Sequence, residues 1–163
     1  PDTFVRSRPL PDRLEAIRDY VLDGGGFVMI GGYMTFQGID AKARYRDTAV
    51  AQVLPIEMQA GDDRCEKPQG IKPVVRQADH PIVTGLAADW PDLLGYNRFA
   101  AASNGVTVAA VGDDPLIVAG SFGKGRSVAF ASDCGPHWAP PSFVEWSGYA
   151  KLWCQIAGWA AGD

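Results

Sequence analysis

The residues best suited to chemistry lie between Ser132 and Trp138, in the sequence Ser-Asp-Cys-Gly-Pro-His-Trp. A strand predicted over 128–131 comes just before them, so these polar side chains fall on a loop at a strand end. Cys134 and His137 could form a thiolate and imidazole pair, because a neighbouring imidazolium lowers the pKa of a thiol and makes it nucleophilic. They are therefore candidate catalytic residues.

The same loop also has a purely structural interpretation. Asp133 would then accept backbone N–H groups in a turn, Cys134 would fill a small buried space, and His137 would anchor the loop by hydrogen bonds. A third interpretation makes Asp133 and His137 ligand-binding residues. A metal site is disfavoured because Cys134 and His137 have no evident third and fourth ligand nearby, and we expect neither a metal nor a cofactor.

Other polar stretches are expected to be structural. His80 precedes Pro81, which imposes an extended or turn conformation on the residue before it. Residues 62–66, Asp-Asp-Arg-Cys-Glu, are expected to form an exposed loop with solvated carboxylates. The sequence Gly-Lys-Gly at 123–125 predicts a hairpin turn and not a phosphate-binding loop.

Length and composition fit a single globular domain over residues 1–163 with one core: 47% of the residues are hydrophobic and 21% are charged. The formal net charge is −4 and no long basic run is present, so nucleic acid is not an expected partner. Apolar runs are far shorter than the ~20 residues of a membrane-spanning helix, so no membrane association is expected. Three widely spaced cysteines fit neither a disulfide framework nor a zinc motif, which predicts a reducing cytoplasm.

The elements that must position the candidate residues follow an α/β order. Apolar residues at helical spacing predict a helix over 10–23, which three glycines end. The apolar run 27–30 predicts a buried strand, because a helix, a glycine stop and a continuous apolar strand are typical of a parallel sheet covered on both faces. This strand leads into Gly31, Gly32 and Tyr33, the kind of strand end that lines a ligand crevice.

The rest of the chain predicts short strands with hairpin turns, then a final helix over 142–161. Ser142 is the expected N-cap of that helix. Its residues Trp146, Tyr149, Trp153 and Ile156 form a stripe that is expected to pack against the sheet. A short helix is expected over 48–54, strands over 55–59, 71–76, 96–100, 106–111, 116–119 and 128–131, and turns at 104–105, 113–115 and 123–125.

Several segments are similar to bacterial cytoplasmic proteins described as putative glutamine amidotransferases, within the class I glutamine amidotransferase-like superfamily. The resemblance spans nearly the whole chain. It is carried by Gly-Gly-Gly-Phe-Val-Met-Ile-Gly-Gly-Tyr at 24–33, Leu-Gly-Tyr-Asn-Arg at 94–98, Ser-Asp-Cys-Gly-Pro-His-Trp-Ala at 132–139, and the aromatic pattern over 143–153.

The resemblance implies a flavodoxin-like sheet whose nucleophile elbow follows the strand 27–30, with a hairpin-rich part after it. Tyr33 then stands at the elbow position where true glutaminases carry their cysteine. Glutaminases also place a His and a Glu just after a strand, whereas His137 lies several residues beyond 128–131 and no His-x-Glu follows. Glutaminase activity is therefore not expected. Because the family places further strands and helices before the elbow strand, the chain is expected to be the C-terminal portion of a longer domain, without its N-terminal strands.

Three hypotheses follow for function. The first is a glutamine amidotransferase-like domain that binds a small polar metabolite in the strand-end crevice. The second is a hydrolase or transferase that uses Cys134 with His137. The third is an interaction or scaffold domain, as in a homo-oligomer, with Trp138, Trp146 and Tyr149 at its surface. In the first hypothesis the ligand-binding residues are Gly31, Gly32, Tyr33, Asp133 and His137.

Overall fold

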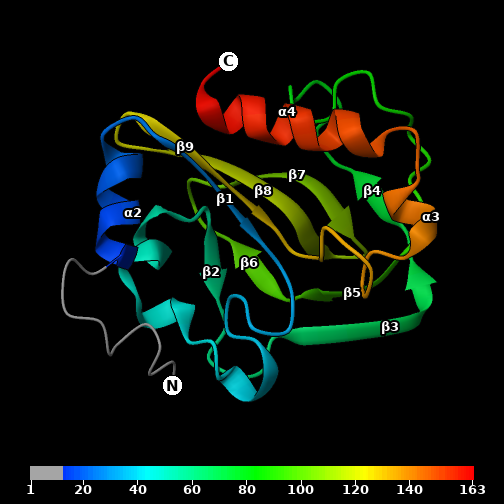
Figure 1. Cartoon of the computed structure of the whole chain (residues 1–163), viewed down its shortest axis with the longest axis horizontal. Helices are drawn as coiled ribbons and strands as arrows, with labels where there is room; N and C mark the ends of the chain where they lie inside the picture. Colours follow the sequence, from blue (N-terminus) through cyan, green and yellow to red (C-terminus); the bar gives the residue numbers. More distant parts are fainter. Residues whose placement is uncertain (1–12) are drawn as a thin grey trace.

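The structure is a computed structural model that describes residues 13–163, and it has a mixed α/β fold, as predicted (Figure 1). Within these residues, one five-stranded sheet has the order β1-β9-β8-β7-β4, and two ladders pair β2 with β6 and β3 with β5. The strands are β1 (Gly26–Ile30), β2 (Ile56–Met58), β3 (Arg64–Ile71), β4 (Pro73–Val75), β5 (Leu93–Asn97), β6 (Phe99–Ala101), β7 (Val106–Val111), β8 (Asp114–Phe122) and β9 (Gly125–Phe130). The α-helices are α2 (Arg13–Leu22), α3 (Pro141–Val144) and α4 (Tyr149–Ala161), and the 3-10 helices are η1 (Ile39–Ala41), η2 (Tyr45–Asp47) and η3 (Ala49–Val53).

The strand pair β1 and β9 carries the candidate site at its end. The two strands run parallel, with Gly26 opposite Arg126, while the other pairs of the central sheet are antiparallel. The parallel strand predicted over 27–30 is confirmed, but its complete burial was wrong, since only Met29 is buried. In the described part of the chain β1 is an edge strand with β9 as its one neighbour, which leaves its other side chains half-buried.

Helical segments cover both faces of the sheet at β9. Neighbouring residues of a strand point to opposite faces. Arg126 Nη1 donates a hydrogen bond of 3.1 Å to the Trp159 carbonyl of α4, whereas Ser127 Oγ donates to the Val53 carbonyl of η3. Helix α4 therefore lies on one face and η3 on the other.

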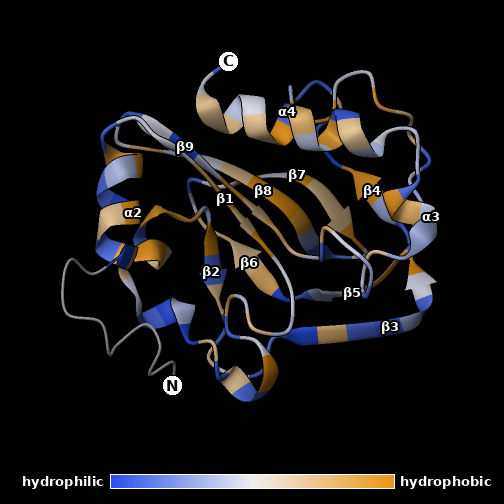
Figure 2. Ribbon diagram, viewed as in Figure 1, coloured by the Kyte–Doolittle hydropathy of each residue, from blue (hydrophilic) through white to orange (hydrophobic). Residues whose placement is uncertain are grey.

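The core is centred on the inner strands of this sheet. Strand β8 buries residues 116–120 without interruption, whereas β3 has no fully buried residue. Figure 2 shows the same contrast, with hydrophobic residues along β8 and hydrophilic residues along β3. The continuous apolar run of β8 thus marks a central strand, whereas the polar strand β3 gives no such signal.

The largest error of the sequence analysis concerns residues 62–66, which do not form an exposed loop. Arg64 begins β3, and Asp63 just before it is 1% exposed. A buried carboxylate is tolerated only with hydrogen-bond donors around it, and these come from distant parts of the chain. The single strand predicted over 96–100 was also wrong: β5 ends at Asn97 and pairs with β3, whereas β6 pairs with β2.

The turns and short elements agree only in part with the predictions. The turn at 123–125 joins β8 to β9 as a hairpin, as predicted, and the helix expected over 48–54 is the 3-10 helix η3. The turn at 104–105 instead joins strands of two different sheets, and residues 114 and 115 belong to β8 rather than to a loop.

The terminal helices differ from the prediction in their boundaries. Residues 10–12 of the predicted first helix lie outside the described residues, and the rest of it is α2. The predicted helix over 142–161 is two helices, α3 and α4, and Pro140 rather than Ser142 is the N-cap of α3.

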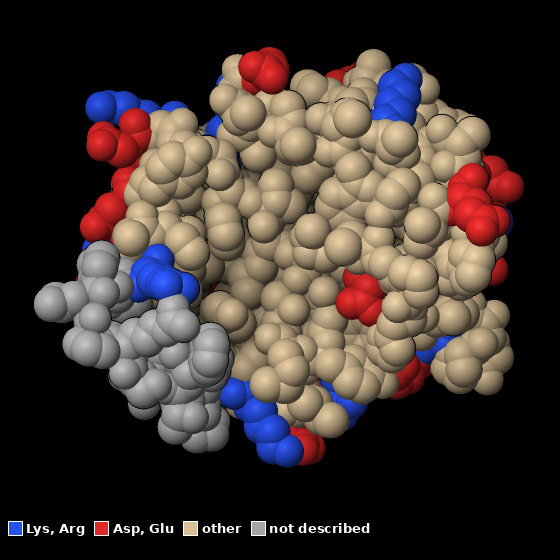
Figure 3. Space-filling model, viewed as in Figure 1, with Lys and Arg blue, Asp and Glu red and all other residues tan. Residues whose placement is uncertain are grey.

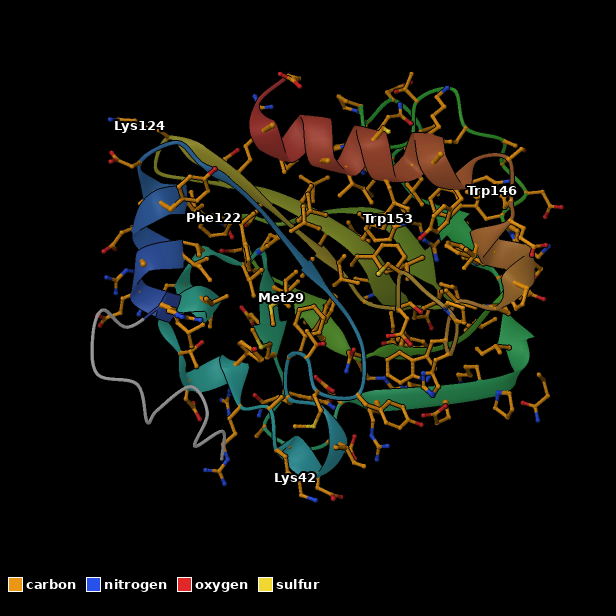
Figure 4. All side chains as sticks on the ribbon, viewed as in Figure 1. Met29, Lys42, Phe122, Lys124, Trp146 and Trp153 are labelled. Carbon is orange, nitrogen blue, oxygen red and sulfur yellow. The ribbon has the colours of Figure 1, made fainter. Side chains whose placement is uncertain are left out.

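The break between α3 and α4 shifts the face that α4 buries. Its buried residues are Leu152, Ile156 and Ala160, so Ile156 packs as predicted. Trp153 is only half-buried, but it projects toward the sheet (Figure 4), where its ring centre lies 4.9 Å from that of Phe130. The other two members of the predicted stripe, Trp146 and Tyr149, are also half-buried.

Charged side chains lie mostly around the rim of the face that Figure 3 shows, and its centre is largely uncharged. No helix among the described residues is long and apolar enough to cross a membrane.

Candidate ligand-binding site

Two strand ends bring the candidate residues together. Tyr33 lies in the turn after β1, and the segment with Asp133 and His137 follows β9. Because β1 and β9 are parallel neighbours, their carboxyl ends meet at the same edge of the sheet. A pocket of about 500 Å³ opens there. Its lining residues are Gly31, Tyr33, Asp133, Cys134, Gly135, Pro136 and His137.

The imidazole of His137 is held by the carboxylate of Asp133. His137 Nδ1 and Asp133 Oδ2 are 2.9 Å apart, and the same oxygen accepts the Trp138 backbone N–H at 3.1 Å. Since a carboxylate can only accept, Nδ1 carries the proton, and Nε2 of the neutral ring is an acceptor. His137 has a φ of 150°, which is costly for a residue with a side chain. The loop therefore holds this ring at the expense of backbone strain.

The Tyr33 ring forms a neighbouring wall of the pocket. Its centre lies 4.6 Å from that of the His137 ring in an edge contact, and the Arg64 guanidinium lies 4.7 Å from its centre. The phenol donates a hydrogen bond of 2.7 Å to Glu66 Oε1. This hydrogen bond to Glu66 raises the pKa of Tyr33, so the phenol is not poised to ionise.

Two residues of β3 support this wall, and the sequence analysis missed both. Glu66 accepts hydrogen bonds from Tyr33 and, at Oε2, from the Trp138 indole N–H at 3.1 Å. Arg64 donates to Asp62 through Nε at 3.1 Å and Nη2 at 2.8 Å. These hydrogen bonds to Arg64 hold the pKa of Asp62 well below its usual range. The sequence predicted an exposed loop over 62–66, and a loop there gave no reason to expect Arg64 or Glu66 beside the pocket.

A buried amide fixes the turn that carries Tyr33. Asn97 is fully buried, and its Oδ1 accepts the Gly32 N–H at 2.8 Å while its Nδ2 donates to the Gly32 carbonyl at 3.1 Å. The side chain thus bonds both backbone groups of Gly32, as a neighbouring strand would. Asn97 Nδ2 also donates to Asp63 Oδ1 at 2.7 Å.

Asp63 extends this network to the far side of the turn. Its carboxylate accepts the backbone N–H groups of Gln37 at 2.8 Å and Gly38 at 2.9 Å. Burial nevertheless raises the pKa of Asp63. With its hydrogen bond from Asn97, the carboxylate ties the residues before and after Tyr33 to the start of β3 and the end of β5.

Gly31 and Gly32 allow the two strand ends to approach each other closely. A Cβ at Gly31 would collide with the Ala131 carbonyl and stand 2.8 Å from Asn97 Oδ1. Gly32 has a φ of 146°, and a Cβ there would stand 2.9 Å from Asp133 Oδ1. Only glycine permits this close approach of the two strand ends.

Cys134 lines the pocket but is not joined to His137. Its thiol is exposed, which contradicts the interpretation of Cys134 as a buried filler. Among the hydrogen bonds of the described residues, none links this thiol to the imidazole, whose Nδ1 is taken by Asp133. The Cys134 carbonyl accepts a hydrogen bond from the Tyr149 phenol. The loop therefore presents the histidine paired with an aspartate.

The remaining candidates have structural environments. His80 Nδ1 accepts the Ile82 N–H at 3.2 Å, and its ring centre lies 5.3 Å from that of Trp159, which agrees with the structural role expected. Trp138 is 1% exposed. The prediction that it lies at the surface with Trp146 and Tyr149 was therefore wrong for Trp138. Residues 13–163 contain no group of three or more His, Cys, Asp or Glu side chains arranged to hold a metal ion.

Comparison with known families shows to which family the chain belongs. A family model described as putative glutamine amidotransferase matches residues 1–161. The chain belongs to this family. A search of curated proteins found no match.

Solved structures agree with this membership. The cytoplasmic protein STM3548 of Salmonella typhimurium is 42% identical, with a TM-score of 0.91, over 98% of this chain and 64% of its own. The cytoplasmic protein STM1381 of S. typhimurium LT2 is 46% identical, with a TM-score of 0.91, over 97% of this chain and 64% of its own. The chain thus spans less than two thirds of the length of these relatives. A ThuA-like protein of Parabacteroides merdae shares the fold at 14% identity, with a TM-score of 0.62, over 94% of this chain and 67% of its own.

Proposed function

We propose that this member of the amidotransferase family binds a small polar ligand in the pocket between Tyr33 and His137, and that it does not hydrolyse glutamine. The observation that carries the proposal is the hydrogen-bonded Asp133–His137 pair at the carboxyl ends of the parallel strands β1 and β9, in the wall of a pocket of about 500 Å³. Pockets of this size accommodate small molecules, and a few fixed polar groups orient them.

The strain in the loop supports a functional role for His137. A non-glycine residue at a φ of 150° persists only where its surroundings hold it, and such residues cluster at binding and catalytic sites. Asp133 fixes one ring nitrogen and Tyr33 packs against the ring edge. Nε2 then remains for a ligand.

The absence of glutaminase chemistry rests on Tyr33. This residue stands at the elbow position that the family resemblance assigns to the nucleophile. Its phenol donates to Glu66, which raises its pKa and disfavours a nucleophilic phenolate. A phenol in this state cannot substitute for a thiolate.

The flavodoxin-like arrangement and a cytoplasmic location belong to the same proposal. The parallel pairing of β1 and β9 supports the first. The second is supported by three free cysteines and by the two relatives named cytoplasmic proteins.

Ligand binding can be followed at His137, because the protein has two histidines. We expect compounds from a panel of small polar metabolites to shift the ring signals of His137 in NMR spectra and to leave those of His80 in place. His137→Ala should abolish the binding and change the unfolding free energy by less than about 1 kcal/mol, since the His137 side chain is 48% exposed. Compounds that bind equally well to His137→Ala would show that the pocket is not the site.

A second candidate function keeps Cys134 as a nucleophile in a hydrolase or transferase. The observation in its favour is the exposed thiol in the same pocket wall as His137. The reactivity of this thiol decides between the two functions.

A further inference from the structure

We propose that the ligand of this pocket is a small primary amine, bound as its ammonium ion. The inference rests on the proposed function and specifies its ligand class. Two observations support it. Some acceptor atoms of the pocket have no hydrogen-bond partner within the described residues, and the charged residues around them are mainly carboxylates.

Two polar side chains of the pocket, those of His137 and Asp133, offer acceptors. His137 Nδ1 is bonded to Asp133, so Nε2 of the neutral ring accepts. Asp133 Oδ2 takes both hydrogen bonds that this carboxylate receives within the described residues, which leaves Oδ1 available. Acceptors on two side chains that line the pocket suit a group with several N–H donors, and an ammonium has three.

Within the described residues, the carboxylates of Asp133 and Glu66 form no ion pair with a lysine or an arginine. Among the ion pairs of residues 13–163, Asp133 pairs only with His137 and Glu66 pairs with none. Glu66 receives the Tyr33 O–H and the Trp138 N–H, both neutral donors. The site therefore has a negative charge that favours a cation.

The guanidinium that packs on the Tyr33 ring is already engaged. Arg64 donates two hydrogen bonds to Asp62, 3.1 and 2.8 Å long, so its charge is balanced. An anion in the pocket would face Asp133 without a free cation among the described residues that line it. A carboxylate or phosphate ligand is thus disfavoured.

Three probes with the same two-carbon hydroxyl frame separate these charges: ethanolamine, ethylene glycol and glycolate. Each is titrated into the protein while the His137 ring signals are followed, with His80 as the internal reference. We expect ethanolamine to bind at least about tenfold more tightly than ethylene glycol, and glycolate to bind most weakly. High salt should weaken the binding of ethanolamine by roughly threefold or more and leave ethylene glycol unaffected, because only the charged probe is screened.

Asp133→Asn should weaken ethanolamine binding by about tenfold or more. Asp23→Asn is the matched control, since it removes the same charge from an exposed residue at the opposite end of β1 and should leave the affinity unchanged. Glycolate that binds as tightly as ethanolamine would overturn the amine inference while the proposed function stands. If none of the three probes shifts the His137 signals, the amine inference is wrong, whereas the proposed function fails only if the panel of small polar metabolites gives no shift either.

Discussion

At the residue scale, Asp133 determines what the neighbouring imidazole can do. By accepting the hydrogen bond from Nδ1, Asp133 leaves Nε2 as the acceptor of the neutral His137 ring and leaves Cys134 without a hydrogen bond to that imidazole. Thiols become strongly nucleophilic beside an imidazolium or another cation. The thiol of Cys134 has no such hydrogen-bonded neighbour among the described residues.

We therefore predict that Cys134 reacts as an ordinary exposed thiol. Its alkylation by iodoacetamide, followed by mass spectrometry, should proceed within about threefold of the rate at Cys154, which is also exposed and serves as the control. His137→Ala should leave the rate unchanged. Alkylation of Cys134 that is much faster than that of Cys154, and that slows in His137→Ala, would favour the hydrolase or transferase instead.

At the element scale, the ends of β3 and β5 position the turn after β1. Asp63 precedes β3 and Asn97 ends β5, and together they bond the backbone of Gly32, Gln37 and Gly38. The turn has no regular secondary structure of its own at Tyr33, so these side-chain hydrogen bonds replace a strand partner. They hold the phenol where it reaches Glu66.

We predict that Asn97→Ala lowers the free energy of unfolding by about 2–4 kcal/mol in denaturant titrations, because it leaves buried groups of Gly32 and Asp63 unbonded. It should also lower the pKa of Tyr33 toward its ordinary value, since the phenol loses its hydrogen bond to Glu66. The tyrosinate absorbance, compared with that of Tyr33→Phe, measures this change.

Val108→Ala provides the control for Asn97→Ala. It removes methyl groups from a fully buried residue of β7, so it should cost about 1–3 kcal/mol and leave the pKa of Tyr33 unchanged. If Asn97→Ala destabilises the protein to the same extent without altering the titration of Tyr33, the network stabilises the fold but does not position the pocket.

These elements also show which features the sequence could predict. The apolar run 27–30, the two glycines after it and the polar loop after 128–131 predicted two strand ends, and the structure places Tyr33, Asp133 and His137 in one pocket. Local patterns sufficed there because each strand has its own hydrophobic signal. Their role in ligand binding stays a prediction.

The support of the pocket could not be predicted in the same way. Asp63 stands in an acidic run that is typical of a solvated loop, and its burial depends on donors at 37, 38 and 97. Asn97 is a single amide within a strand, and nothing local marks it as the partner of Gly32. Long-range hydrogen bonds of this kind leave no periodic pattern in the sequence.

At the scale of the whole molecule, α4 is held on the sheet by the loop that contains His80. Gln155 Nε2 donates to the carbonyls of Pro81 and Thr84, and the His80 ring packs on Trp159. Burial lowers the pKa of His80, and its Nδ1 accepts a hydrogen bond that only the neutral ring can accept.

We predict that acid weakens the fold through His80. The pKa of His80 is lower in the folded than in the unfolded chain, so the unfolded chain binds more protons and stability falls as the pH drops below about 6.5. Urea unfolding of His80→Gln should show a shallower loss of stability between pH 7 and 5, roughly the range over which an unfolded histidine titrates. An equally steep loss in His80→Gln would assign the effect to other groups.

The central claim is that a small polar molecule binds between Tyr33 and His137. The most direct test is to measure intermolecular nuclear Overhauser effects between bound ethanolamine and the aromatic protons of the protein. This proposal predicts contacts from the methylene protons of ethanolamine to the rings of both Tyr33 and His137, and no contacts in His137→Ala. Contacts confined to other aromatic rings, or unchanged in His137→Ala, would contradict it.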